Sequence, residues 1–68
     1  MLALLMAKDK KGNVLKIKEV CEAENWAKLS QEMIELSAVK GTYKVVAQTA
    51  TRKEAYFPSE RSFVQNIQ

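Results

Sequence analysis

The chain of 68 residues has room for one domain with one core, and its net charge is +3. A hydrophobic fraction of 47% beside 28% charged residues is typical of a globular domain, and it excludes a disordered tail, a collagen-like repeat and a low-complexity linker. One cysteine excludes an internal disulfide bond, and without histidine no plausible zinc-ligand set exists, so we expect neither a metal nor another cofactor.

The first seven residues are apolar, but this run is too short for a transmembrane helix, which needs about 20 apolar residues. A secretory signal would place positive charge before the apolar run, whereas here the lysines follow it. We therefore interpret residues 2–7 as a β-strand and expect no membrane partner. The single unpaired cysteine agrees with a reducing compartment, so we expect a cytoplasmic protein.

Residues 8–13 predict a hairpin loop, because Gly12 tolerates positive φ and the charged side chains keep the tip in water. In residues 14–18 apolar and charged side chains alternate, which predicts a second strand. The alternation sends Leu15 and Ile17 to one face and Lys16 and Lys18 to the other. It breaks at residues 19–21, where we expect a bulge or the end of the strand. Residues 1–22 are thus predicted to form a β-hairpin.

Residues 24–40 predict the one long helix of the chain. Its apolar positions share one stripe at a period of 3.6 residues: Trp26, Ala27, Leu29, Met33, Ile34 and Leu36. Asn25 or Glu24 is expected to cap the start, and Gly41 stands where a left-handed stop residue belongs. Trp26 is expected to lie in the core.

Residues 42–58 predict two further strands. The first, at residues 42–49, is rich in β-branched and aromatic side chains. A polar turn at residues 51–54 separates it from a short strand at residues 55–57, which Pro58 ends because proline cannot donate to a strand ladder.

The tail, residues 59–68, leaves two alternatives open: a helical turn capped by Ser59, or an edge strand formed around Phe63 and Val64. Together the elements predict a single α+β domain over residues 1–68. It consists of a small antiparallel sheet in the order β-β-α-β-β, with one amphipathic helix packed on one face.

One helix covers one face of the sheet, so the other face is expected to be open to solvent. We expect polar side chains of the second and third strands there: Lys16, Lys18, Lys44 and Gln48. The first strand is apolar on both faces, and of the neighbours Tyr56 and Phe57 one must point away from the helix. This predicts an apolar patch rimmed by lysines, unless the tail covers it with Phe63, Val64 and Ile67.

The sequence carries no catalytic motif, so we expect the protein not to be an enzyme. Without histidine every Ser-His or Cys-His relay is absent, and Cys21 is expected to be a small buried apolar group. The glutamates of the predicted helix share its solvent side with lysines, which indicates a solvated surface. The two glycines are isolated, so they form no phosphate-binding loop.

The preferred interpretation is a small non-catalytic binding protein that occupies the surface of a macromolecular partner, most readily another protein. It would act as an inhibitor or regulatory subunit of the kind that phages encode. The predicted contact residues are Lys16, Lys18, Lys44, Arg52, Lys53, Tyr56 and Phe57.

Two alternatives stay open. The lysine-rich sheet face could bind nucleic acid, with Tyr56 or Phe57 stacking on bases. Tyr43 is a third stacking candidate, although the strand alternation places it inward with Val45. A structural homo-oligomer is the second alternative, formed as a dimer through the apolar first strand or by pairing of strand edges.

Overall fold

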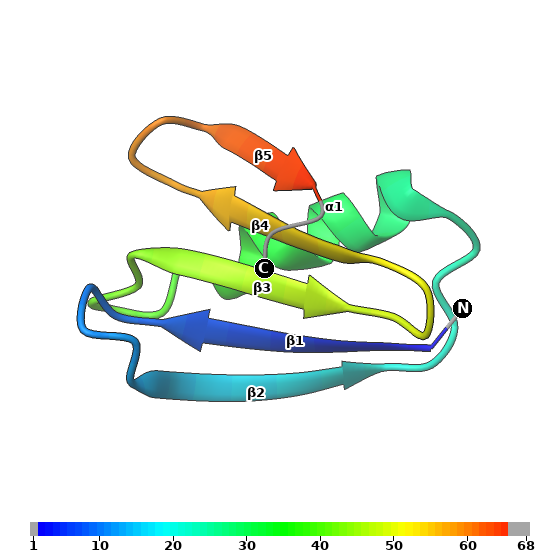
Figure 1. Ribbon diagram of the computed structural model, residues 1–68, viewed down its shortest axis with the longest axis horizontal. Coiled ribbons are helices and arrows are strands. Elements are labelled where there is room, and N and C mark those ends of the chain that lie inside the picture. The colour runs from blue at the N-terminus through cyan, green and yellow to red at the C-terminus, as the bar shows by residue number, and fades with distance from the viewer. Residues whose placement is uncertain (1, 66–68) are drawn as a thin grey trace.

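A computed structural model describes residues 2–65, which form a five-stranded antiparallel sheet with one helix on one face (Figure 1). The elements in chain order are β1 (Ala3–Lys8), β2 (Val14–Val20), α1 (Trp26–Leu36), β3 (Lys44–Gln48), β4 (Lys53–Phe57) and β5 (Ser62–Gln65). In the sheet the order is β2-β1-β3-β4-β5, so β2 and β5 are the edges. The predicted α+β class and the β-β-α-β-β order are confirmed, and β5 adds a fifth strand.

The loop between β1 and β2 is held by the side chain of Asp9. Its Oδ1 accepts hydrogen bonds from the backbone N–H groups of Lys11 and Asn13, both at 2.9 Å. The amide side chain of Asn13 donates to Oδ2 at 3.1 Å, and Gly12 supplies the positive φ of +88° that the tight turn requires. The backbone of Asn13, and after it the Asn13 side chain, lower the pKa of Asp9 by hydrogen bonding to the carboxylate. The predicted hairpin loop is confirmed.

Helix α1 is shorter than the predicted 24–40 at both ends. It begins after Asn25, whose side chain accepts a hydrogen bond from the backbone N–H of Lys28 at 3.0 Å, so this predicted cap is confirmed. It ends at Leu36, because beyond Ser37 the N–H groups of Ala38 and Val39 bond to carbonyls three residues back and form turns instead of a further helical repeat. Gly41 does have a positive φ of +91°, but it lies in these turns, beyond the helix end.

The core lies between α1 and the covered face of the sheet. Figure 1 shows α1 behind the sheet, where it packs on β1 and β3. The side chains buried there come from three strands, the helix and the segment before it: Ala3, Leu5 and Ala7 of β1, Val45 and Ala47 of β3, Tyr56 of β4, Leu29, Met33 and Leu36 of α1, and Ala23. Trp26 packs against this cluster only partly buried, so it borders the core instead of filling it.

The tail forms an edge strand, as the second of the two alternatives predicts. β5 pairs antiparallel with β4, and it brings Phe63 opposite Tyr56 on the covered face, with 4.6 Å between ring centroids. Val64 lies opposite Ala55 on the other face. β5 therefore extends the sheet sideways and does not fold across the open face, while Ile67 lies outside the described residues.

Within residues 2–65 no helix is both long enough and apolar enough to cross a membrane.

The candidate binding face

The face of the sheet opposite α1, called the open face below, carries a continuous line of aliphatic side chains. Its members are direct cross-strand neighbours, one from each strand, and we call them the apolar row: Ile17, Met6, Val46, Ala55 and Val64. The middle of the row is shielded by its neighbours, since Val46 is 7% and Ala55 1% exposed. Its ends are open to solvent, with Ile17 58% and Val64 45% exposed. The row thus crosses the whole width of the sheet.

Lysines and aromatic rings border the apolar row on one side. Lys8 of β1 and Lys44 of β3 are direct cross-strand partners. Phe57 of β4 stands next along the same line, and Tyr43 lies edge-on to it, with ring centroids 5.7 Å apart and an interplanar angle of 78°. Tyr43 precedes β3 and is 39% exposed, so its predicted inward orientation is wrong.

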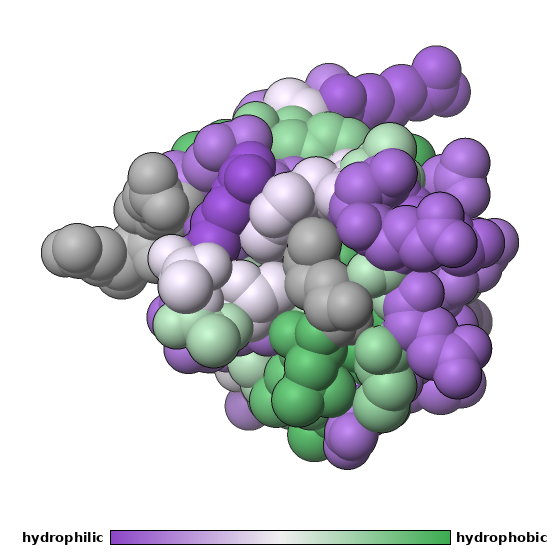
Figure 2. Space-filling model, turned by 90° about the vertical axis from the view of Figure 1, so that its right-hand side faces the viewer, coloured by the Kyte–Doolittle hydropathy of each residue, from purple (hydrophilic) through white to green (hydrophobic). Residues whose placement is uncertain are grey.

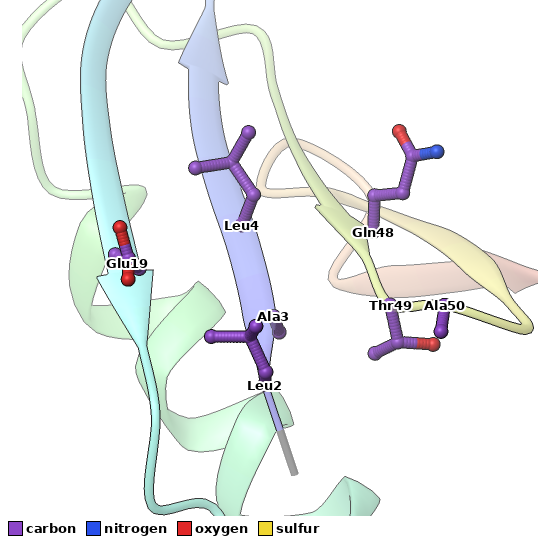
Figure 3. Close-up of a pocket in the computed structure, with 7 residues that line it drawn as sticks. All are labelled: Leu2, Ala3, Leu4, Glu19, Gln48, Thr49 and Ala50. Atoms are coloured by element: carbon purple, nitrogen blue, oxygen red, sulfur yellow. The ribbon is translucent and has the colours of Figure 1, made fainter.

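A shallow groove borders the apolar row on the other side, where β1 begins. Its volume is about 390 Å³, and it is lined by Leu2, Ala3, Leu4, Glu19, Gln48, Thr49 and Ala50 (Figure 3). Leu2 and Leu4 project between Glu19 of β2 and the segment that follows β3. Figure 2 shows a hydrophobic area among hydrophilic side chains at this end of the molecule. The groove therefore continues the apolar surface to the sheet's end.

No protein-family model, curated protein or solved structure matches the chain. The function of the open face is therefore inferred from its own side chains. They combine exposed aliphatic groups with aromatic rings inside a polar border, and apolar patches with polar borders are found on surfaces that bury against another macromolecule. Among residues 2–65, no three Cys, Asp or Glu side chains gather closely enough to hold a metal ion.

The seven predicted contact residues divide between the two faces. Lys44, Lys53 and Phe57 lie on the open face, because they alternate with the buried residues of β3 and β4. Tyr56 points to the covered face and is 6% exposed, so its predicted role as an open-face contact is wrong. Phe57 is the member of the pair that faces away from the helix.

Lys16 and Lys18 lie on the covered side of β2, so their predicted place on the open face is wrong. They are the cross-strand partners of Ala7 and Leu5, both fully buried under α1. The physical reason is that α1 packs on β1 and β3, so the covered side of β2 extends past the helix into solvent. Long charged side chains are favoured in that position, and Ile17 turns to the open face instead.

The ammonium group of Lys18 forms an ion pair with Glu32 of α1. The hydrogen bond from Lys18 is the main cause that lowers the pKa of the Glu32 carboxylate, and the same bond raises the pKa of Lys18. This pair ties the edge strand to the helix. Lys18 therefore has a structural role and is not part of the open face.

Arg52 also belongs to the covered side. Its guanidinium carbon lies 4.0 Å from the centre of the Trp26 ring, and its Nη2 is 3.2 Å from a carboxylate oxygen of Glu54. Glu54 is 3% exposed and is the cross-strand partner of buried Ala47. Arg52 thus closes the end of the core over Trp26, and its predicted role as an open-face contact is not supported by this position.

Cys21 is exposed, so the prediction of a buried apolar cysteine is wrong. It follows the end of β2, where the chain leaves the sheet for α1. Desolvation by its neighbours raises the pKa of the thiol, and so does a hydrogen bond from Sγ to Glu19 at 3.6 Å. The group is therefore protonated at neutral pH and a poor nucleophile.

The sequence predicts that the first strand, with Met6, is apolar on both faces, but it does not predict the other members of the open face: Lys8, Ile17, Val46 and Val64. Lys8 looked like part of the hairpin loop, yet it is the last residue of β1. The signal that could have found it is the alternation of Leu4, Met6 and Lys8 along one side of β1. Alternation does not reveal how β2 pairs with β1. The register of the two strands shifts between Ala7 and Lys8, and this shift leaves Leu15 of β2 without a cross-strand partner.

Proposed function

We propose that this chain is a small, non-catalytic, cytoplasmic binding protein that docks a protein partner on its open face. The apolar row carries this proposal. The solvent face of an antiparallel sheet is normally polar, whereas here one aliphatic side chain per strand forms its middle line. Covering the row with apolar side chains of a partner would remove Ile17 and Val64, the most exposed of its members, from water.

The aliphatic character of the row favours a protein over a nucleic acid. Bases stack on aromatic rings, and the two rings near the open face, Tyr43 and Phe57, lie at one border of the row and pack on each other. The opposite border carries both Glu19 and Lys53, so it offers a phosphate backbone no net attraction. Protein side chains, by contrast, can bury against Ile17, Met6 and Val64 along the whole row.

In this function the protein acts by occupancy. A partner that lies across the open face loses access to its own contact surface, which is how an inhibitor or regulatory subunit works without chemistry of its own. Lys44, Lys53 and Phe57 are the contacts predicted from the sequence that this face holds, and Ile17, Met6 and Val64 join them.

The test is affinity capture from a lysate of the native host, with and without nuclease, using wild type and two matched variants. Ile17→Asp alters the open face, and Ile34→Asp places the same charge on the outer surface of α1, where Ile34 is 47% exposed. Circular dichroism first verifies that both variants fold. We expect one protein to be captured despite nuclease, to be lost with Ile17→Asp and to be kept with Ile34→Asp.

Other outcomes contradict the proposal. Capture that disappears with nuclease would make the open face a nucleic-acid surface. A partner kept by Ile17→Asp would bind elsewhere on the molecule. A wild type that sediments as a dimer, together with a monomeric Ile17→Asp variant, would identify a structural homo-oligomer.

A further inference from the structure

Two lysines are held side by side on the open face without a carboxylate to neutralise them. Lys8 and Lys44 occupy directly opposite positions on β1 and β3, an arrangement that destabilises a sheet because like charges repel. The ion pairs among residues 2–65 join Lys18 to Glu32 and Arg52 to Glu54, so neither serves Lys8 or Lys44. The fold therefore tolerates a repulsion that an anionic group from outside would remove.

The opposite border of the open face has a different chemistry. There Leu2 and Leu4 line the groove of about 390 Å³, and Glu19 supplies the carboxylate. Leu2 is 62% and Leu4 39% exposed. Lys53 of β4 lies on this border too, as the cross-strand partner of Gln48, so Glu19 and Lys53 together give it no net charge. A ligand that follows the apolar row thus meets two lysines at one side and a groove without net charge at the other, which gives the face a preferred orientation.

We propose that the occupant of the open face is an acidic, amphipathic protein segment, whose carboxylates lie over Lys8 and Lys44 while its apolar side chains lie along the apolar row. This inference rests on the proposed function and specifies its partner. Carboxylates suit the lysine pair because charge-assisted hydrogen bonds form there without breaking an existing ion pair. The apolar side chains supply the buried area, and the charges select the partner and set its orientation.

A second copy of this chain fits the open face poorly. Among the described strand residues the face presents Lys8, Lys44 and Lys53 against Glu19, so two copies face to face would bring positive charges together. Phosphates would satisfy the lysine pair, but a nucleic acid would leave the apolar row uncovered. An acidic segment with apolar residues satisfies both parts of the surface.

The experiment selects peptides from a random dodecapeptide library displayed on phage, with the whole domain immobilised. Three forms are used in parallel: wild type, the double variant Lys8→Glu/Lys44→Glu, and the control Lys10→Glu/Lys11→Glu. The control makes the same change in net charge within the exposed hairpin loop. Selected peptides are then synthesised and titrated against all three forms and against Ile17→Asp and Ile34→Asp.

We expect wild-type binders to be rich in Asp, Glu and apolar residues relative to the library. Their affinity should fall about tenfold with Lys8→Glu/Lys44→Glu and less than about twofold with the loop control, because close charge pairs dominate over distant ones. Binding should also be lost with Ile17→Asp and kept with Ile34→Asp.

Results that overturn the inference differ from those that overturn the proposed function. Peptides that need Ile17 but carry no acidic bias would refute the acidic partner and leave the binding face intact. If no selected peptide responds to Ile17→Asp, both proposals fail. Tighter binding of single-stranded oligothymidine than of the best peptide, or a wild type dimeric through this face, would also refute the acidic partner.

Discussion

The two faces of this sheet are built from neighbouring residues and yet have opposite characters. On the covered face Leu5 and Val45 are fully buried beneath α1, whereas one residue away on the same strands Leu4 and Lys44 face solvent. The covered face is sealed by side chains that pack only within the chain. The open face carries nearly as many apolar groups without a covering layer, and this difference is the basis of the proposal that they make contacts outside the chain.

The charges follow the same division. Ion pairs on the covered side join Lys18 to Glu32 and Arg52 to Glu54, while Lys8 and Lys44 on the open face stand together. The contacts that stabilise the fold thus lie on one side of the sheet, and the proposed binding surface lies on the other. The following experiments test this separation.

The largest difference is expected between Leu5→Ala and Leu4→Ala, adjacent leucines on opposite faces of β1. Leu5→Ala should lower the free energy of unfolding by about 3 kcal/mol, because it leaves a cavity in a close-packed core. Leu4→Ala should cost about 1 kcal/mol, since Leu4 is already 39% exposed. Urea denaturation monitored by Trp26 fluorescence measures both. Equal losses would show that the open face is as much a core as the covered face.

A smaller loss of stability is expected when the carboxylate of Glu54, on the covered side, is removed. Glu54→Ala should destabilise the protein by about 2 kcal/mol, less than a fully buried pair would lose, because Arg52 keeps 28% of its side chain exposed. The same urea titration measures it. The isosteric Glu54→Gln variant is the control: if it is as stable as wild type, then shape and not charge accounts for this position.

Lys44→Glu should act in the opposite direction. It converts the like-charge pair with Lys8 into an opposite-charge pair, so thermal stability should rise by the equivalent of about 0.5 kcal/mol. The same substitution should weaken binding of an acidic partner. A loss of stability in differential scanning calorimetry would mean that Lys44 already has a stabilising contact. The charge of the Lys8–Lys44 pair would then not be free to attract an acidic partner.

The smallest effect concerns the Lys18–Glu32 pair, whose contribution depends on pH. The pKa of Glu32 is lowered from its ordinary 4.5 and that of Lys18 is raised from 10.5. The stabilisation is therefore complete between these two values. It disappears as pH falls through the lowered pKa of Glu32, or rises through the raised pKa of Lys18.

The measurement is the difference in melting temperature between wild type and Glu32→Gln across this pH range. It should stay constant near neutrality and shrink towards zero in acid, because both chains are then uncharged at position 32. A difference in melting temperature that grows in acid would show that the ion pair does not account for the stabilisation by Glu32. Asp9 titrates in the same acid region in both chains, so its effect cancels in the difference.

The sequence predicts those features that depend on local chemistry. The stripe of Leu29, Met33 and Leu36 predicts α1 and its buried side, and Asn25 predicts where the helix begins. Gly12 and the charged side chains of residues 8–13 predict the hairpin loop. Each signal lies within a few residues, so no knowledge of the rest of the fold is needed.

Which side chains form the open face depends on where the helix packs on the sheet. No short stretch of sequence contains this information. Ile17 was expected to point inward because apolar side chains in amphipathic strands usually do. Its actual direction follows from how far α1 reaches across the sheet, because the helix packs mainly on β1 and β3 and residues 14–19 of β2 stay exposed. For the same reason the predicted open-face position of Lys16 and Lys18 is wrong, while that of Lys44, in a strand next to the core, is correct. The alternation alone does not decide which of Tyr56 and Phe57 faces away from the helix.

Strand β5 links recognition to local stability. It is four residues long, it is bonded to β4 alone, and Phe63 and Val64 remain 37% and 45% exposed. Its opening costs fewer contacts than opening β1 or β3, so its amide protons should exchange with solvent sooner. Opening would also carry Val64 out of the apolar row. A partner that rests on Val64 must therefore hold β5 closed, so slower amide exchange in this one strand would report directly that the open face is occupied.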